Sequence, residues 1–310
     1  MQLLPILLAE TGLSEQDLNR IARTAPRRYK VYEIPKRSGG TREIAQPARE
    51  LKMLQRIIVS SVLARLPVHD AAKAYRLGTS IRDNAVAHAG GTPILKMDFE
   101  NFFPSIQSTD WLAYCQSSRV LGVEDAALAA QLLFRRAKGE RLLKLSIGAP
   151  SSPALSNALL YGFDTIVEAE AEKRGIRYTR YADDMTFSGQ RIGMLKDMVE
   201  VVAAATRTIK TPRLHINSAK TTFVTMSNRR TVTGVTLSND GKIGLGHDRK
   251  RLINAKVHRA LNGKLSNDEL ANLAGELAFV NVAEPIFMDK LIGKYGSQII
   301  SAIKKSVRAT

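Results

Sequence analysis

Three aspartates occupy positions from which carboxylates could act together on a phosphorylated substrate. Asp98 ends an apolar run at 93–97 that predicts a strand, and Asp183 and Asp184 lie side by side between two strand-like runs. If those strands are neighbours, the side chains converge, and their oxygens are ligands that Mg²⁺ prefers. Two such ions about 3.5–4 Å apart can activate an attacking hydroxyl and stabilise a departing pyrophosphate. Because side chains alternate along a strand, we expect Asp183 to bind the ions directly together with Asp98. Asp184 should contribute partly through the residues that bind the ions and not by binding them itself.

The elements around these aspartates are of both kinds, which indicates an α+β fold. The expected strands are 30–34 and 42–45, joined by a turn at 38–40 into a basic hairpin, and 93–98, 177–181, 185–188, 220–225, 231–237 and 242–245. The expected helices are 14–23, 51–66, 128–133, 155–167 and 192–202, followed by a helical tail from Arg249. Capping boxes are expected at 14–17, at the start of the first of these helices, and at 266–269 inside the tail.

Charge and composition narrow the class of protein. The 310 residues contain 46 Lys and Arg against 29 Asp and Glu, and the net charge of +17 favours an anionic partner such as nucleic acid. The excess lies in two places: eleven Lys and Arg against three Glu between Arg20 and Arg56, and twelve against six Asp and Glu from Lys242 onward. One cysteine excludes a disulfide framework and a cysteine-based zinc module. With no apolar run of bilayer length and no secretion signal, we expect a cytoplasmic protein without a membrane partner.

Several motifs resemble those of one enzyme family. Residues 181–184 (Tyr-Ala-Asp-Asp) resemble the Tyr-x-Asp-Asp signature of reverse transcriptases, 97–103 resemble their first catalytic motif, and 148–157 resemble the motif between the two. Residues 84–88 (Asn-Ala-Val-Ala-His) and 232–234 (Val-Thr-Gly) resemble two elements of bacterial retron reverse transcriptases. An isolated Asp-Asp pair is more often a turn that bonds its own backbone. The full set in this order favours the family.

The resemblance implies RNA-directed DNA synthesis by an α+β right-hand polymerase. Residues 1–95 would form N-terminal helices and fingers, 96–235 the palm with helices at 104–147, and 236–310 a helical, RNA-binding thumb. The enzyme would copy a cognate structured non-coding RNA from dNTPs. Priming from a 2′-hydroxyl of a guanosine in that RNA would give branched RNA–DNA (msDNA). The resemblance also implies a bacterial cytoplasm and anti-phage defence with a separately encoded effector protein. Because only about 60 residues follow Arg249, we expect host RNase H to remove the template.

The same resemblance assigns residues to the ions and the nucleotide. Two Mg²⁺ ions fall to Asp98, Asp183 and Asp184, with the backbone carbonyl of Phe99 as a further ligand. The residues implied for dNTP binding are Lys36, Arg42, Phe103, Gly148 and Lys220.

Each nucleotide residue has a distinct expected role. Lys36 and Arg42 would hold the triphosphate, and Lys220 would lie near the leaving pyrophosphate. The Phe103 ring would exclude a 2′-hydroxyl under the incoming sugar, with Phe102 as its rival for that role. Gly148 would let the backbone approach the nucleotide closely.

One position departs from the family pattern. Many relatives carry Gln before the glycine of the middle motif, where this chain has Ile147. A side-chain hydrogen bond to the nucleotide is therefore not expected from Ile147.

The resemblance also suggests residues for RNA binding in three segments. They are Asn84, His88, Val232, Thr233, Gly234, Arg249, Lys250, Arg251 and Lys256. A helix that carries the last four would suit an A-form duplex, which proteins recognise by shape, phosphates and 2′-hydroxyls. A buried histidine is more often a packing residue than a ligand, and a basic helix is more often a solvated face.

Two other functions compete with the retron hypothesis. One is another bacterial reverse transcriptase of the phage-exclusion or intron type, although an intron enzyme would usually carry a maturase-like extension. The other is a non-catalytic RNA-binding scaffold or antitoxin with a vestigial polymerase site. The intact Asp98, Asp183 and Asp184 argue against the scaffold.

Overall fold

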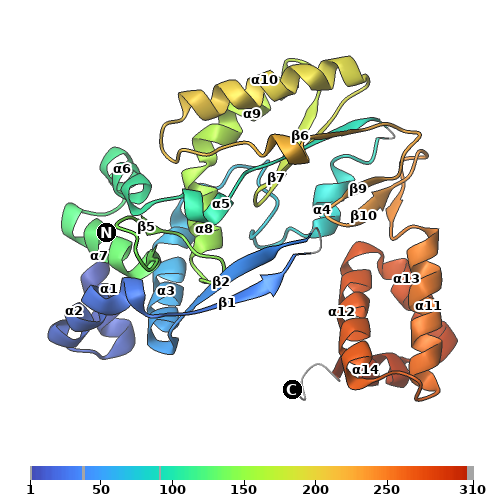
Figure 1. Ribbon diagram of the computed structural model, residues 1–310, viewed down its shortest axis with the longest axis horizontal. Coiled ribbons are helices and arrows are strands. Elements are labelled where there is room, and N and C mark those ends of the chain that lie inside the picture. The colour runs from blue at the N-terminus through green and yellow to red at the C-terminus, as the bar shows by residue number, and fades with distance from the viewer. Residues whose placement is uncertain (1, 37–38, 91, 306–310) are drawn as a thin grey trace. The chain divides into compact units, whose positions relative to one another are not determined.

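The computed structural model describes residues 2–36, 39–90 and 92–305, and the chain divides into two compact units. Unit 1 comprises Met1–Arg76, Lys96–Met185 and Lys196–Thr221, and unit 2 comprises Leu77–Leu95, Thr186–Leu195 and Thr222–Thr310. Each unit has its own buried apolar residues. Figure 1 labels the elements in chain order.

The N-terminal part of unit 1 is helical because apolar residues recur there at three- and four-residue spacing. Its helices are α1 (Leu3–Thr11), α2 (Glu15–Thr24), α3 (Arg49–Ser61), α6 (Ser108–Ser118) and α7 (Val123–Leu133), with 3₁₀ turns at Ala25–Arg27 and Leu63–Arg65. Ser14 caps α2 by accepting a hydrogen bond from the Asp17 amide, as the sequence predicts. Helices α1, α3 and α7 contact one another and bury Leu7, Leu54 and Leu133. The predicted helix 51–66 thus ends early, at Ser61.

An antiparallel hairpin precedes α3 and confirms the predicted basic hairpin (Figure 1, blue). Strand β1 (Tyr29–Pro35) pairs with β2 (Thr41–Pro47) so that Tyr29 lies opposite Pro47. Ser38 of the predicted turn lies outside the described residues. Most of β1 is exposed, whereas Ala45 of β2 is buried, so the hairpin is anchored at its base.

A four-stranded sheet in the order β6–β7–β3–β8 carries the aspartates. Its strands are β3 (Ile94–Asp98), β6 (Arg177–Tyr181), β7 (Asp184–Ser188) and β8 (Thr222–Val224). Strand β3 is buried at four of its five positions, as expected for an apolar central strand. Strands β6 and β7 form the predicted hairpin, with a turn at 182–183.

The predicted helix 155–167 is wrong as a single helix. It is divided into α8 (Ser152–Leu159) and α9 (Tyr161–Glu172), because Leu160 leaves helical geometry with φ −93° and ψ 4°. The break changes the direction of the chain, and α9 then packs against β6. The other elements of this region are α5 (Phe102–Ser105), α10 (Ile192–Thr208), β4 (Arg135–Arg136) and β5 (Leu143–Lys144).

Unit 2 combines a small sheet with a helical bundle. Its elements are α4 (Ile81–Val86), β9 (Arg230–Val232), β10 (Val235–Leu237), β11 (Ile243–Gly244), α11 (His247–Leu261), α12 (Asn267–Ala283), α13 (Pro285–Tyr295) and α14 (Ser297–Lys305). The predicted strand 231–237 is wrong, because Thr233 (φ 48°) and Gly234 (φ 80°) turn the chain into a β9–β10 hairpin. Ser266 and Glu269 form the predicted capping box of α12.

Helix α12 is the centre of the unit 2 core. It contacts α11, α13 and α14 (Figure 1, orange to red) and buries Leu273, Leu277 and Val280 among Ile253 and Val257 of α11. Within the described part of the chain, no helix is both long enough and apolar enough to cross a membrane.

Candidate active site

The three aspartates converge within unit 1. Asp98 ends β3 with 6% of its surface exposed, and the next amide, that of Phe99, donates to the carbonyl of Asp183 at 3.2 Å. Asp184 begins β7, and the nearby Asp183 and Asp98 carboxylates add to the rise of its pKa that burial causes. Which of Asp183 and Asp184 would share the ions with Asp98 directly stays a prediction. Strand alternation fails here because Asp183 belongs to the turn, after Ala182 in the left-handed region at φ 58°.

Nearby positive groups neutralise only part of the negative charge of the three carboxylates. Loss of hydration, together with the Asp183 and Asp98 carboxylates, raises the pKa of Asp184 to about 6, although Asp184 is still exposed on one side. Burial raises the pKa of Asp183, and the charge of Asp98 adds to the rise. Groups of like charge held together in this way are typical of functional sites.

Lys220 supplies the nearest positive charge. It is the last residue of the 3₁₀ turn Ser218–Lys220, whereas the sequence predicts that a strand begins at Lys220. Its Nζ donates to both carboxylate oxygens of Asp98 at 2.9 and 3.0 Å. The hydrogen bond to Asp98 raises the pKa of Lys220. The Lys220 side chain is about half exposed, so the pair contributes little to stability.

The aspartates fit a hard divalent cation in donor type and in charge. Across residues 2–36, 39–90 and 92–305, however, no three His, Cys, Asp or Glu side chains stand arranged as a ready metal site. The ammonium of Lys220 covers both oxygens of Asp98 in this arrangement. A cation bound by Asp98 would therefore compete with the Lys220 ammonium for this carboxylate.

A cavity of about 330 Å³ lies in the same unit. Its lining residues are Lys52, Arg56, Tyr75, Phe103, Ser146, Ile147, Gly148, Ala149, Pro150, Ser152 and Pro153. Phe103 lines this cavity, whereas Phe102 is 4% exposed and stacks on Phe99 in the core. Of the two rival phenylalanines, Phe103 is the one that lines the cavity, and its contact with a nucleotide stays a prediction.

Gly148 is needed for a contact that the sequence does not suggest. Its φ is 113°, and a Cβ at this position would lie 3.0 Å from the Ala45 carbonyl oxygen and 3.1 Å from an Ile44 side-chain carbon. The neighbouring Ile147 carbonyl accepts a hydrogen bond from the Ala45 amide at 2.8 Å. Gly148 therefore allows this loop to pack on β2, as well as to line the cavity.

The two basic residues of the hairpin differ in their surroundings. Burial raises the pKa of Asp183 and of Tyr75, and the positive charge of Arg42 offsets a small part of each rise, which places Arg42 within electrostatic range of both. Lys36 is exposed, and its backbone closes the hairpin turn through hydrogen bonds with Gly39 and Gly40. The structure thus brings Arg42 toward the aspartates, and it leaves the side-chain role of Lys36 a prediction.

Comparison with known proteins decides the family. A family model described as "Reverse transcriptase (RNA-dependent DNA polymerase)" matches residues 34–237. The Ec83 retron reverse transcriptase of Escherichia coli is 38% identical over 281 residues, which cover 89% of this chain and 90% of that protein. This chain belongs to the retron reverse transcriptases. It is an RNA-directed DNA polymerase with the α+β right-hand polymerase fold.

Two further relatives are also retron reverse transcriptases. The Ec86 retron reverse transcriptase of Escherichia coli is 32% identical over 95% of this chain and 91% of its own length. The Mx65 retron reverse transcriptase of Myxococcus xanthus is 33% identical over 86% of this chain and 64% of its own. Among solved structures, telomerase from Candida albicans with a fragment of telomeric RNA matches 91% of this chain and 61% of its own, with 12% identity and a TM-score of 0.45.

The retron elements at 84–88 and 232–234 lie inside unit 2. Asn84, His88 and Val232 are each 1% exposed, and His88 Nδ1 lies 2.7 Å from the Ser188 hydroxyl. The Thr233 hydroxyl donates to the Ile81 carbonyl at 2.9 Å, which ties the β9–β10 turn to α4. A Cβ on Gly234 would lie 3.2 Å from the Phe279 ring. These contacts are internal, and RNA binding by this group stays a prediction.

The basic residues of α11 also make internal contacts. The Arg249 guanidinium lies 4.1 Å from the centre of the Phe279 ring, Lys250 pairs with Glu284, and Lys256 pairs with Glu276 at 2.7 Å. Arg251 is exposed and makes no such pair with a described residue. Of the four basic residues predicted on the thumb helix of this retron reverse transcriptase, Arg251 is the one most available to a phosphate.

Sequence reasoning missed two residues of the retron active-site region. Tyr75 is 52% exposed on the cavity wall, 6.4 Å from the Phe103 ring, and adopts φ 59°, which is rare for an aromatic residue. Arg180 is fully buried two residues before Ala182. A charged residue inside a predicted strand is the signal for Arg180; the sequence carries no such signal for Tyr75.

Proposed function

We propose that Asp98, Asp183 and Asp184 of this retron reverse transcriptase hold two Mg²⁺ ions, with the Phe99 carbonyl as a further ligand. The convergence of Asp98, Asp183 and Asp184 in unit 1 is the observation that carries this proposal, and burial together with the neighbouring carboxylates raises the pKa of Asp183 and of Asp184. When bound, the ions supply Lewis-acid activation of the attacking hydroxyl and stabilisation of the departing pyrophosphate. In each addition, the hydroxyl oxygen attacks the α-phosphorus of a dNTP, the bond to the pyrophosphate breaks, and the hydroxyl proton leaves to solvent.

The chain's own residues would bind and orient the nucleotide. Arg42 and Lys36 would hold the triphosphate, which suits their place on an exposed hairpin. Phe103 would lie beneath the sugar and exclude a 2′-hydroxyl, and its position on the cavity wall supports this role. Gly148 would form the adjoining wall.

Lys220 would change partners during the reaction. Its ammonium neutralises Asp98 in the structure, and with nucleotide present it would hold its proton and positive charge near the departing pyrophosphate. Its largely exposed side chain supports this, since little packing has to be broken.

For the retron product, the support comes from the family. The enzyme would copy part of a cognate structured non-coding RNA, primed from a 2′-hydroxyl of a guanosine in that RNA, into branched msDNA. Host RNase H would remove the copied template, and a separately encoded effector protein would act with the product in anti-phage defence in the bacterial cytoplasm.

We assign the three parts of a right-hand polymerase to three ranges of the chain. Residues 1–95 would serve as N-terminal helices and fingers, 96–235 as the palm, and 236–310 as the RNA-binding thumb, of which 306–310 lie outside the described residues. The exposed Arg251 of α11 supports contact of the C-terminal segment with RNA.

Primer extension on an RNA template with dNTPs and Mg²⁺ tests the proposed function. We expect dNTP-dependent extension that EDTA abolishes. A protein that binds the RNA but extends no primer over a range of Mg²⁺ and Mn²⁺ concentrations would instead be an RNA-binding scaffold. A denatured-protein control and a DNA template complete the comparison.

A further inference from the structure

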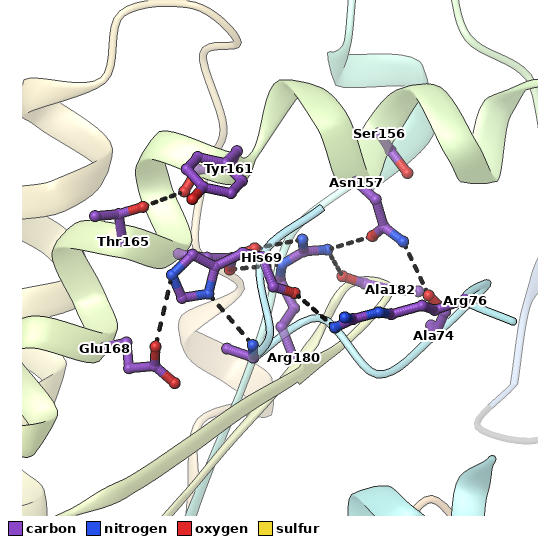
Figure 2. Close-up of polar contacts among 12 residues, drawn as sticks. His69, Ala74, Arg76, Ser156, Asn157, Tyr161, Thr165, Glu168, Arg180 and Ala182 are labelled. Carbon is purple, nitrogen blue, oxygen red and sulfur yellow. Dashed lines mark hydrogen bonds and ion pairs between the residues drawn. The ribbon is translucent and has the colours of Figure 1, made fainter. Parts of the chain in front are cut away.

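A buried ion pair joins β6, the strand that leads into the aspartate turn, to α9; Figure 2 shows its arginine, Arg180, with Asn157 and Ala182. Arg180 of β6 and Asp164 of α9 are both fully buried, and two hydrogen bonds join them: Nε to Oδ1 at 2.8 Å and one terminal nitrogen to Oδ2 at 2.6 Å. The Tyr178 hydroxyl also donates to Asp164, at 2.8 Å. Burial alone lowers the pKa of Arg180, but the Asp164 carboxylate more than offsets this and raises it, so the guanidinium stays charged.

The second terminal nitrogen of Arg180 points toward the catalytic turn. It donates to the Ala182 carbonyl at 3.0 Å. Ala182 is 6% exposed and holds a left-handed backbone immediately before Asp183. A non-glycine residue keeps this conformation only where its surroundings enforce it. The hydrogen bond from Arg180 is one such constraint on the turn that presents Asp183 and Asp184.

Hydrogen bonds also connect the same nitrogen, through Asn157, to the loop that carries the cavity residue Tyr75. The nitrogen lies 3.3 Å from the Asn157 side-chain oxygen, and the Asn157 amide nitrogen donates to the Ala74 carbonyl at 2.9 Å. Ala74 precedes Tyr75, the cavity residue with a left-handed backbone. Backbone hydrogen bonds of 2.8 Å from Arg180 to Ala71 and from Lys73 to Arg180 hold the same loop beside β6.

We propose that Arg180, Asp164 and Asn157 form one positioning network with two branches. The branch through Ala182 sets the aspartates that bind the metal ions, and the branch through Asn157 and Ala74 sets Tyr75, which then limits how a nucleotide fits against Phe103. The inference rests on the proposed function of the aspartates and the cavity. None of the three residues has to touch the substrate.

Isosteric variants can separate the branches. Asn157→Asp keeps an oxygen for Arg180 but loses the donor to Ala74, so the KM for dNTP should rise about tenfold while kcat stays within about threefold. Discrimination against ribonucleotides should weaken in parallel. Tyr75→Ala should have the same effects, and the double variant should add little, because the two residues share one path.

Substitutions in the branch through Ala182 should change kcat. Arg180→Lys keeps the charge but cannot make the forked contacts, so kcat should fall about 100-fold and the KM for dNTP should rise as well. Adding Ala182→Gly should recover about tenfold of kcat and none of the KM, because glycine adopts the left-handed turn without strain. Arg174→Lys, the same change in a partly exposed ion pair next to α9, is the matched control.

Mn²⁺ binding gives a readout that does not depend on synthesis. Electron paramagnetic resonance of free Mn²⁺, titrated with protein, should show weaker binding by Arg180→Lys and recovery with Ala182→Gly. If Arg180→Lys does not fold, Ala182→Val in the wild-type background replaces it, because a β-branched residue resists the left-handed turn. Ala182→Val should lower kcat and Mn²⁺ affinity and leave the KM for dNTP unchanged.

Two results would overturn the network. One is an Asn157→Asp protein with unchanged KM and discrimination, and the other is an Arg180→Lys protein that melts at a lower temperature but keeps wild-type kcat and Mn²⁺ affinity. If the wild type extends no primer, the proposed function fails instead, and the Mn²⁺ titration still tests the aspartate branch.

Discussion

The two units use their charged residues in opposite ways. In unit 1, Asp98, Asp183 and Asp184 stand together with Lys220 as a half-exposed counter-ion. Burial and the two neighbouring carboxylates raise the pKa of Asp184 to about 6. In unit 2, the basic residues of α11 are largely satisfied: Lys250 and Lys256 each face a glutamate, and Arg249 lies on an aromatic ring.

The difference indicates that the charged residues of the unit 1 site serve the reaction, whereas most of those on α11 serve the stability of unit 2. Carboxylates that repel one another reduce stability, and a protein keeps them where function requires them. Cations paired with internal partners already stabilise their own unit, so their positive charge alone is weak support for RNA contact. The comparison predicts that substitutions in unit 1 change the reaction and that most substitutions on α11 change stability.

The largest expected effect is loss of synthesis on replacing Asp183. Asp183→Asn should lower the rate of primer extension by at least about 10³-fold, because a metal ligand is lost while the shape is kept. RNA affinity should stay within about threefold, as measured by filter binding. Asp240→Asn, the same change at an exposed aspartate of unit 2 that pairs with Lys242, is the control and should remain active. Equal loss of RNA binding in Asp183→Asn would argue against the metal assignment.

The next effect separates the two neighbouring phenylalanines. Phe103→Ala should weaken discrimination against ribonucleotides by about 10- to 100-fold with little change in melting temperature, because its ring lines the cavity. Phe102→Ala should instead destabilise the protein by about 3 kcal/mol, because its ring is buried against Phe99. Competition between dNTP and NTP in single-nucleotide extension measures the first change, and thermal unfolding measures the second. The reverse pattern would transfer the sugar-facing role to Phe102.

A smaller effect tests the same contrast within α11. Arg251→Gln should lower RNA affinity several-fold and reduce the salt dependence of binding by about one unit of slope, with an unchanged melting temperature. Lys256→Gln should cost about 1 kcal/mol of stability, because Glu276, whose second carboxylate oxygen is already buried without a hydrogen bond, would lose its partner. Filter binding over a range of salt concentrations and thermal unfolding give both answers. If Lys256→Gln weakened RNA binding without destabilising the protein, the contrast between the units would fail.

The smallest effect is a dependence of stability on pH. The folded-state pKa of Asp184 is about 6, above its usual value of 3.8, so its protonated form stabilises the metal-free protein at pH 4 and this contribution is lost as the pH rises through 6. Asp184→Asn should therefore be more stable than wild type at pH 7 in EDTA, by at most about 1 kcal/mol because water screens the partly exposed group. At pH 4 the difference should vanish. A less stable Asp184→Asn protein at pH 7 would contradict the account of mutual repulsion.

Much of this fold could be predicted from local sequence. The caps at Ser14 and Ser266, the β1–β2 hairpin and strand β3 depend on residues close together in the chain, and the structure confirms them. The break at Leu160 and the turn at Thr233 could not be predicted, because each depends on where the following element packs.

The same limit applies to the site. The sequence identified the three aspartates, but it did not predict the left-handed turn at Ala182 that presents Asp183 and Asp184 to Asp98. The Arg180–Asp164 pair joins residues 16 positions apart on two elements, and Gly148 serves a contact with β2 that is far away in sequence. Such partners appear only when the chain is folded.

The nucleic acid that co-purifies with the protein tests the central claim most directly. Wild-type protein and Asp183→Asn, produced with their cognate RNA in the same cells, should be isolated in parallel and their nucleic acids sequenced after nuclease treatment. We expect RNA in both samples, and DNA joined to a guanosine 2′-hydroxyl of that RNA in the wild-type sample alone. DNA of equal amount in both samples, or wild-type protein that carries RNA without any DNA, would contradict the account.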